Sequence, residues 1–116
     1  MLPPALPSGA PDAAAPLVPP ARVLLVDDDI VARGRVRDVV SAEPDLTIVG
    51  ECADGETAAA MIVAARPDLV LLDVQMPGLD GFDVVARVGA AAMPPVVFLS
   101  AYAEFAVRAF EAYALD

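Results

Sequence analysis

Hydrophobic residues after residue 21 fall into two alternating patterns. Short, mainly apolar runs occupy residues 23–26, 46–50, 68–73 and 95–100, and such runs are typical of buried strands. Between the runs, apolar residues recur at intervals of three and four, as on the buried face of a helix. The residues that define these faces are Ala32, Val36, Val39 and Val40; Ala58, Met61, Ile62 and Ala65; Phe82, Val85 and Val88; and Ala106, Ala109, Phe110 and Tyr113. The predicted order is β-α-β-α-β-α-β-α.

This alternation predicts an α/β fold with a doubly wound parallel sheet. Strands that are apolar along their whole length belong in sheets whose two faces are both covered by helices. The crossovers between parallel strands should be right-handed. In such sheets ligands bind beyond the carboxyl ends of the strands, near the point where the strand order reverses. The polar residues that end the strands are therefore the first candidates for chemistry.

A Pro- and Ala-rich segment precedes the first strand. Residues 1–20 hold seven of the twelve prolines. Because proline lacks an N–H and fixes φ, this composition suits extended or disordered chain. We expect residues 1–21 to form a disordered leader and residues 22–116 to form one folded domain. A proline-motif ligand is the less favoured interpretation of the leader.

Carboxylates follow the predicted strands. The first strand runs directly into Asp27, Asp28 and Asp29, the third ends in Asp73, and the fourth ends in Ser100. Carboxylates that converge in a partly dry cleft repel one another, and no basic residue adjoins the three in the sequence. A divalent cation would remove this repulsion, and oxygen ligands of this kind suit Mg²⁺. The sequence therefore predicts a magnesium site at this edge of the sheet.

An aspartate beside Mg²⁺ can also act as a nucleophile toward a phosphoryl group. Asp73 and the nearby hydroxyl of Ser100 suit this chemistry, since a hydroxyl can donate a hydrogen bond to a phosphoryl oxygen. Not every carboxylate needs such a role. Asp29 is better explained as a carboxylate at the start of a helix than as a ligand, and Asp54 and Asp80 are expected to begin the next two helices.

Composition limits the other functions. The net charge is −10, with seven Arg, no Lys and no His, so direct nucleic-acid binding is not expected. The single cysteine, Cys52, excludes an internal disulfide and suits a reducing compartment. No apolar run approaches the roughly 18 residues of a membrane helix, and the N-terminus lacks the charged opening of a secretory signal. A cytoplasmic protein without membrane contact is expected.

Three motifs together resemble a known family. They are the acidic VDDD after the first strand, LDVQMPGLDG around Asp73, and FLSAY at the end of the fourth strand. The chain resembles the receiver domain of two-component response regulators from about Arg22 to its last residue. The resemblance implies a flavodoxin-like fold with strand order 2-1-3-4-5.

The resemblance also implies roles for individual residues. Asp73 would be the phosphoacceptor, Asp28 would bind Mg²⁺ directly, and Asp27 would assist. The backbone carbonyl of Gln75 would complete the protein ligands of the metal. Ser100 would contact the phosphoryl group and couple its arrival to movement of the fourth helix.

Two further positions in this family tune the hydrolysis of the phosphoaspartate. Gln75 and Tyr102 occupy them here, two residues beyond Asp73 and Ser100 respectively. Cys52 is expected to be a bystander in or near the core.

The last stretch, AYAEFAVRAFEAYALD, resembles receivers of the LytR/AlgR type, which precede LytTR-type DNA-binding domains. In that group a fifth strand, a lysine and a fifth helix follow, and the chain contains none of these. We therefore expect a receiver that is truncated before its fifth strand. Its fourth strand would then be a hydrophobic edge, and the chain would be marginally stable or would associate.

The leading hypothesis is a signalling domain and not an enzyme in the usual sense. A sensor histidine kinase would be its partner, a homodimer is possible, and DNA would be bound by a C-terminal domain of the parent protein. One alternative is a degenerate interaction domain that works without phosphorylation. A less favoured alternative is a haloacid-dehalogenase-like phosphatase, since Asp27 and Asp29 form a D-x-D pair.

Overall fold

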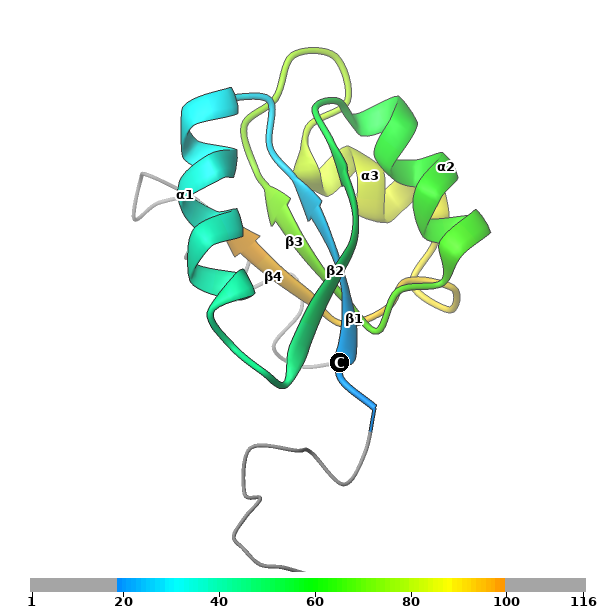
Figure 1. Cartoon of the computed structure of the whole chain (residues 1–116). Coiled ribbons are helices and arrows are strands. Elements are labelled where there is room, and N and C mark those ends of the chain that lie inside the picture. The colour runs from blue at the N-terminus through cyan, green and yellow to red at the C-terminus, as the bar shows by residue number, and fades with distance from the viewer. Residues whose placement is uncertain (1–18, 100–116) are drawn as a thin grey trace, which may run out of the picture.

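Four parallel strands form one sheet with helices on both faces (Figure 1). The computed structural model describes residues 19–99. Its elements in chain order are β1 (Ala21–Val26), α1 (Ile30–Ser41), β2 (Leu46–Cys52), α2 (Gly55–Ala65), β3 (Leu69–Asp73), α3 (Gly81–Val88) and β4 (Val96–Leu99). The strand order is β2-β1-β3-β4, which confirms the predicted flavodoxin-like α/β fold. Residues 1–18 and 100–116 lie outside the described part, and with them most of the leader, Ser100, Tyr102 and the fourth predicted helix.

The central strand β1 is buried on both faces, which explains its uninterrupted apolar sequence. Its side chains alternate between two cores because successive residues of a strand point to opposite faces. Leu24 and Val26 join the core shared with α2 and α3, whereas Val23 and Leu25 join the core under α1. In Figure 1, α1 covers one face of the sheet while α2 and α3 cover the other. Packing on both faces therefore fixes the position of β1, the strand that leads into Asp27 and Asp28.

Strand ends differ from the sequence prediction by a few residues. β1 begins at Ala21, which the sequence placed in the leader, because the Ala21 amide bonds to the Asp45 carbonyl at 2.8 Å. β2 extends to Cys52, and its pairing with β1 shifts register between Val23 and Leu24. Cys52 is buried, and burial raises the pKa of its thiol to about 11. The thiol therefore stays protonated near neutral pH, as expected of a bystander.

Aspartates begin all three helices of the described part. Asp54 accepts a hydrogen bond from the Thr57 amide at 2.7 Å, and Asp80 forms a reciprocal capping box with Asp83. Both caps were predicted and are confirmed. Such side chains satisfy backbone amides that have no partner in the first turn of a helix. They fix where each helix leaves the loops at the carboxyl edge of the sheet.

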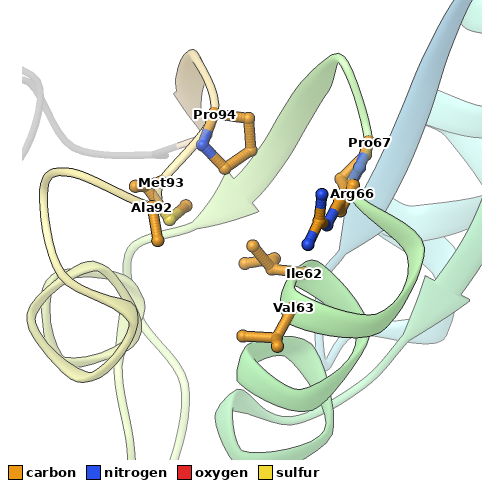
Figure 2. Close-up of a pocket in the computed structure, with 7 residues that line it drawn as sticks. All are labelled: Ile62, Val63, Arg66, Pro67, Ala92, Met93 and Pro94. Atoms are coloured by element: carbon orange, nitrogen blue, oxygen red, sulfur yellow. The ribbon is translucent and has the colours of Figure 1, made fainter.

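The opposite edge of the sheet contains a mainly apolar hollow of about 370 Å³ (Figure 2). It lies between the end of α2 and the loop before β4, and its lining residues are Ile62, Val63, Arg66, Pro67, Ala92, Met93 and Pro94. Arg22 ties β1 to the end of α2, because its Nη1 donates to the carbonyls of Ala65 and Arg66 at 2.9 Å each. No acidic group lines the hollow.

The close packing of α3 against the end of β3 generates a prediction about Gly81. An added Cβ there would lie 2.6 Å from the Asp73 carbonyl oxygen and 3.0 Å from the Val74 Cα. Because both are backbone atoms, Gly81→Ala should lower the free energy of unfolding by about 1–3 kcal/mol. Urea denaturation followed by circular dichroism measures this.

Gly34→Ala in the middle of α1 is the matched control. The nearest atom to its added Cβ is Arg37 Nη1 at 3.7 Å, an ordinary contact. Alanine is the better helix former, so this variant should gain up to about 1 kcal/mol. Equal stability of Gly81→Ala and the wild type would contradict the packing described here.

Candidate metal centre

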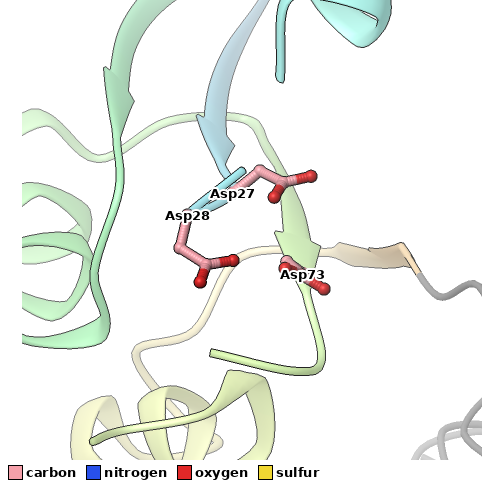
Figure 3. Close-up of side chains that lie close together, drawn as sticks. All are labelled: Asp27, Asp28 and Asp73. Atoms are coloured by element: carbon pink, nitrogen blue, oxygen red, sulfur yellow. The ribbon is translucent and has the colours of Figure 1, made fainter. Parts of the chain in front are cut away.

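Three carboxylates converge at the carboxyl edge of the sheet (Figure 3). Asp27 and Asp28 follow β1, and Asp73 is the last residue of the neighbouring strand β3. One carboxylate oxygen from each side chain lies within 4.8 Å of the other two. The sequence predicted this convergence, since the carboxyl ends of parallel strands share one edge.

The three side chains differ in exposure. Asp27 is 5% exposed, Asp73 is half-buried and Asp28 is exposed. Asp27 Oδ1 accepts a hydrogen bond from the Asp29 amide at 2.9 Å, and Asp73 Oδ1 accepts one from the Gln75 amide at 3.1 Å. Each half-buried or buried carboxylate is thus oriented by a backbone N–H two residues further on. The site is open on the side of Asp28.

Burial, together with neighbouring negative charge, changes the protonation of Asp73. Its pKa is raised to about 7, chiefly by burial, and the adjacent Asp27 and Asp28 carboxylates raise it further. The hydrogen bond from the Gln75 amide opposes this rise because it favours the ionised form. Without a cation, Asp73 is therefore only partly ionised near neutral pH.

A basic side chain that was not predicted lies beside this group. Arg33, on α1, donates from Nη1 to the Asp27 carbonyl oxygen at 2.6 Å and from Nε to Glu51 Oε1 at 3.2 Å. Its charge is paired with Glu51 and it bonds to the backbone of Asp27, so the three carboxylates themselves gain no salt bridge from it. The sequence does carry a signal for this contact of Arg33. Arg33 lies four positions after Asp29, one turn into the helix that follows the acidic run.

Comparison with known proteins places the chain in a family. The profile of the response regulator receiver domain matches residues 23–116. The chain belongs to the response regulator receiver family.

Similar proteins include transcriptional regulators. The receiver is 40% identical over 95 residues to the transcriptional regulatory protein BtsR of Salmonella typhi, covering 82% of this chain and 40% of that protein. It is 38% identical over 95 residues to BtsR of Escherichia coli K12, with the same coverage of each chain. The chain thus spans about 40% of the length of these curated relatives.

Solved structures give the same fold. A LuxR-family two-component response regulator from Aurantimonas superposes with a TM-score of 0.72 at 28% identity, covering 81% of this chain and 69% of that chain. The response regulator domain of CheB from Thermotoga maritima superposes with a TM-score of 0.70 at 28% identity, covering 79% and 72%. As a member of the response regulator receiver family, the chain is a signalling domain.

The acidic group of the receiver fits a hard divalent cation. Its donors are all carboxylate oxygens, and they are closely spaced. Mg²⁺ takes oxygen ligands and usually only one or two protein carboxylates, keeping waters on its other positions. The exposure of Asp28 leaves room for those waters.

Other predicted site residues have different positions. Asp29 is the N-cap of α1, and its Oδ1 accepts from the amides of Val31 and Ala32 at 2.9 and 3.2 Å. It stands outside the three-carboxylate group, so the D-x-D pair of the phosphatase alternative is not assembled. Gln75 is exposed and contributes its amide to Asp73; the role of its carbonyl stays a prediction. Ser100 and Tyr102 lie outside the described residues.

No helix within residues 19–99 is both long and apolar enough to cross a bilayer.

The raised pKa of Asp73 predicts how pH acts on the metal-free receiver. Asp73 should hold its proton up to about pH 7 in the folded chain, whereas the ordinary value is 3.8. As pH rises between these values, the unfolded chain releases this proton first, so stability falls through the window. Asp73→Asn removes this contribution. Urea denaturation in chelator should therefore show that the variant gains stability relative to wild type between pH 4.5 and pH 7.5.

Asp45→Asn makes the same charge change at an exposed position in the loop before β2. It should track the wild type over this pH range. A pH dependence in Asp73→Asn equal to that of wild type would contradict the placement of Asp73 among uncompensated carboxylates.

Proposed function

We propose that this receiver accepts a phosphoryl group on Asp73, in a Mg²⁺-dependent reaction, from the phosphohistidine of a sensor histidine kinase. The observation that carries the proposal is the convergence of Asp27, Asp28 and Asp73 at the ends of β1 and β3. In this arrangement one carboxylate is oriented as a nucleophile while the other two offer oxygen ligands to a cation.

Asp73 is suited to the acceptor role by its position. The Gln75 amide holds Oδ1, which fixes the plane of the carboxylate at the mouth of the site. A carboxylate oxygen of Asp73 would bond to phosphorus while the bond from phosphorus to the histidine nitrogen breaks and its electron pair returns to the imidazole. Bound Mg²⁺ would offset the charge of the carboxylates and of the transferring group.

The remaining roles rest on the family resemblance. Asp28 and Asp27 would be the carboxylate ligands of the metal, with the Gln75 carbonyl as the third protein ligand. Ser100 would donate a hydrogen bond to the phosphoryl group and relay its arrival to the following helix. Gln75 and Tyr102 would set how fast water hydrolyses the phosphoaspartate.

The regulatory output would come from a DNA-binding domain of a longer parent protein. The names of the curated relatives support transcriptional regulation, and the stretch AYAEFAVRAFEAYALD supports a LytTR-type DNA-binding domain after the receiver. DNA would be bound there and not by residues 19–99. The homodimer and the cytoplasmic location stay predictions.

Phosphorylation itself gives the direct test. After incubation with a small acyl phosphate donor and Mg²⁺, intact-mass measurement should show one phosphoryl adduct on the wild-type chain. Asp73→Asn should show none, because it lacks the nucleophilic oxygen. Asp28→Asn should need at least about 10-fold more Mg²⁺ for the same extent of labelling, since it removes a metal ligand.

Asp45→Asn serves again as the matched control and should label as the wild type does. Circular dichroism on each sample separates a folding defect from a chemical one. A folded wild-type chain that takes up no phosphoryl group would sink the proposal and favour the phosphorylation-independent interaction domain.

A further inference from the structure

We propose that Arg33 is a positioning residue for the metal centre, an inference that rests on the proposed function above. Arg33 holds the peptide unit between Asp27 and Asp28, so that both carboxylates keep the spacing that binds Mg²⁺. Glu51 in turn holds Arg33. Arg33 touches neither the metal nor the phosphoryl group in this account, and acts only through the backbone.

The contact of Arg33 with the site is short and sheltered. Nη1 lies 2.6 Å from the Asp27 carbonyl oxygen, and the Arg33 side chain is 15% exposed. A hydrogen bond from a charged donor in such a place is stronger than one between neutral groups. The carbonyl of Asp27 belongs to the same planar peptide unit as the Asp28 amide. Fixing this oxygen therefore fixes the orientation in which Asp28 leaves the strand.

Other bonds complete the hold on Asp27. Its amide donates to the Cys52 carbonyl at 3.1 Å, which ties it to β2. Its carboxylate accepts from the Asp29 amide at 2.9 Å. Arg33 supplies the tie on the carbonyl side, from α1. The peptide unit that Arg33 holds joins Asp27 and Asp28, two of the three side chains drawn in Figure 3.

Glu51 braces Arg33 from β2. It accepts from Arg33 Nε at 3.2 Å and from Arg37 Nε and Nη2 at 2.6 and 2.8 Å. The hydrogen bond from Arg37, with a further contribution from Arg33, lowers the pKa of Glu51. Glu51 therefore stays ionised and keeps the Arg33 guanidinium aimed at Asp27.

Arg37 provides a matched control within the same helix. It carries the same charge, binds the same Glu51, and is 43% exposed against 15% for Arg33. Its guanidinium donates hydrogen bonds to Glu51, whereas that of Arg33 also reaches the Asp27 carbonyl oxygen. A purely structural role in tying α1 to β2 is therefore shared by both arginines, whereas the contact with Asp27 belongs to Arg33.

Electrostatics and positioning predict opposite effects of removing Arg33. Removing a positive charge beside a cation site should tighten Mg²⁺ binding if charge alone matters. Releasing the peptide unit between Asp27 and Asp28 should weaken it, because the ligands lose their preorganised spacing. The sign of the change in Mg²⁺ affinity therefore decides between the two.

The test is Mg²⁺ titration of the full chain, followed through the ¹⁵N–¹H signals of residues 27–29. Arg33→Gln should raise the dissociation constant for Mg²⁺ about 10-fold, the scale found when groups that orient metal ligands are removed. Arg37→Gln leaves both contacts of Arg33 in place and should therefore weaken Mg²⁺ binding much less than Arg33→Gln. Arg33→Lys, which keeps the charge but lacks the fork that spans Glu51 and the Asp27 carbonyl, should also weaken binding.

Each outcome decides the inference. Unchanged or tighter binding by Arg33→Gln would overturn it and leave the proposed function standing. If Arg33→Gln does not fold, Arg33→Lys is the deciding variant, and wild-type affinity there would overturn the inference. Equal weakening by Arg33→Gln and Arg37→Gln would also overturn it, in favour of a shared structural role. A wild-type chain that binds no Mg²⁺ would overturn both this inference and the proposed function.

Discussion

Repulsion among three carboxylates is the constraint on which the rest of this structure depends. Two unit charges about 4 Å apart near a protein surface interact by about 4 kcal/mol, and the three oxygens of Asp27, Asp28 and Asp73 lie within 4.8 Å of one another. A domain is typically stable by only about 5–15 kcal/mol. A proton or a cation at the group would relieve this repulsion. The pKa of Asp73 is raised to about 7, chiefly by burial and further by the neighbouring carboxylates.

Packed strands, helix caps and one arginine hold the three carboxylates in place despite this repulsion. β1 and β3 are adjacent, buried strands whose register cannot slip without moving apolar side chains into water. Aspartate caps fix the helix starts at the same edge. Arg33 brings the one cationic side chain that bonds directly to the acidic loop within the described part of the chain. The three carboxylates are thus held in fixed positions, as the proposed phosphorylation switch would need.

Hydrophobic patterns, helix-cap residues and the rule for strand ends predicted most of the fold and of the acidic site. Short apolar runs and period-3.6 patterns predicted the strands and helices. The rule for the carboxyl ends of parallel strands predicted that Asp27 and Asp73 lie at one edge. The caps at Asp54 and Asp80 follow from residues next to each other in the chain. The start of β1 at Ala21 could not be predicted, because it depends on pairing with the distant Asp45 carbonyl. Arg33 was missed for the same reason, since its contacts depend on how α1 is rotated against β2.

The most direct test of the central claim is the melting temperature of the wild-type chain with and without Mg²⁺, at constant ionic strength. If the cation relieves the repulsion, the melting temperature should rise with Mg²⁺ by mass action, and Asp28→Asn should lose most of the rise. A melting temperature that responds to Mg²⁺ no more than to the same ionic strength of a monovalent salt would contradict the account.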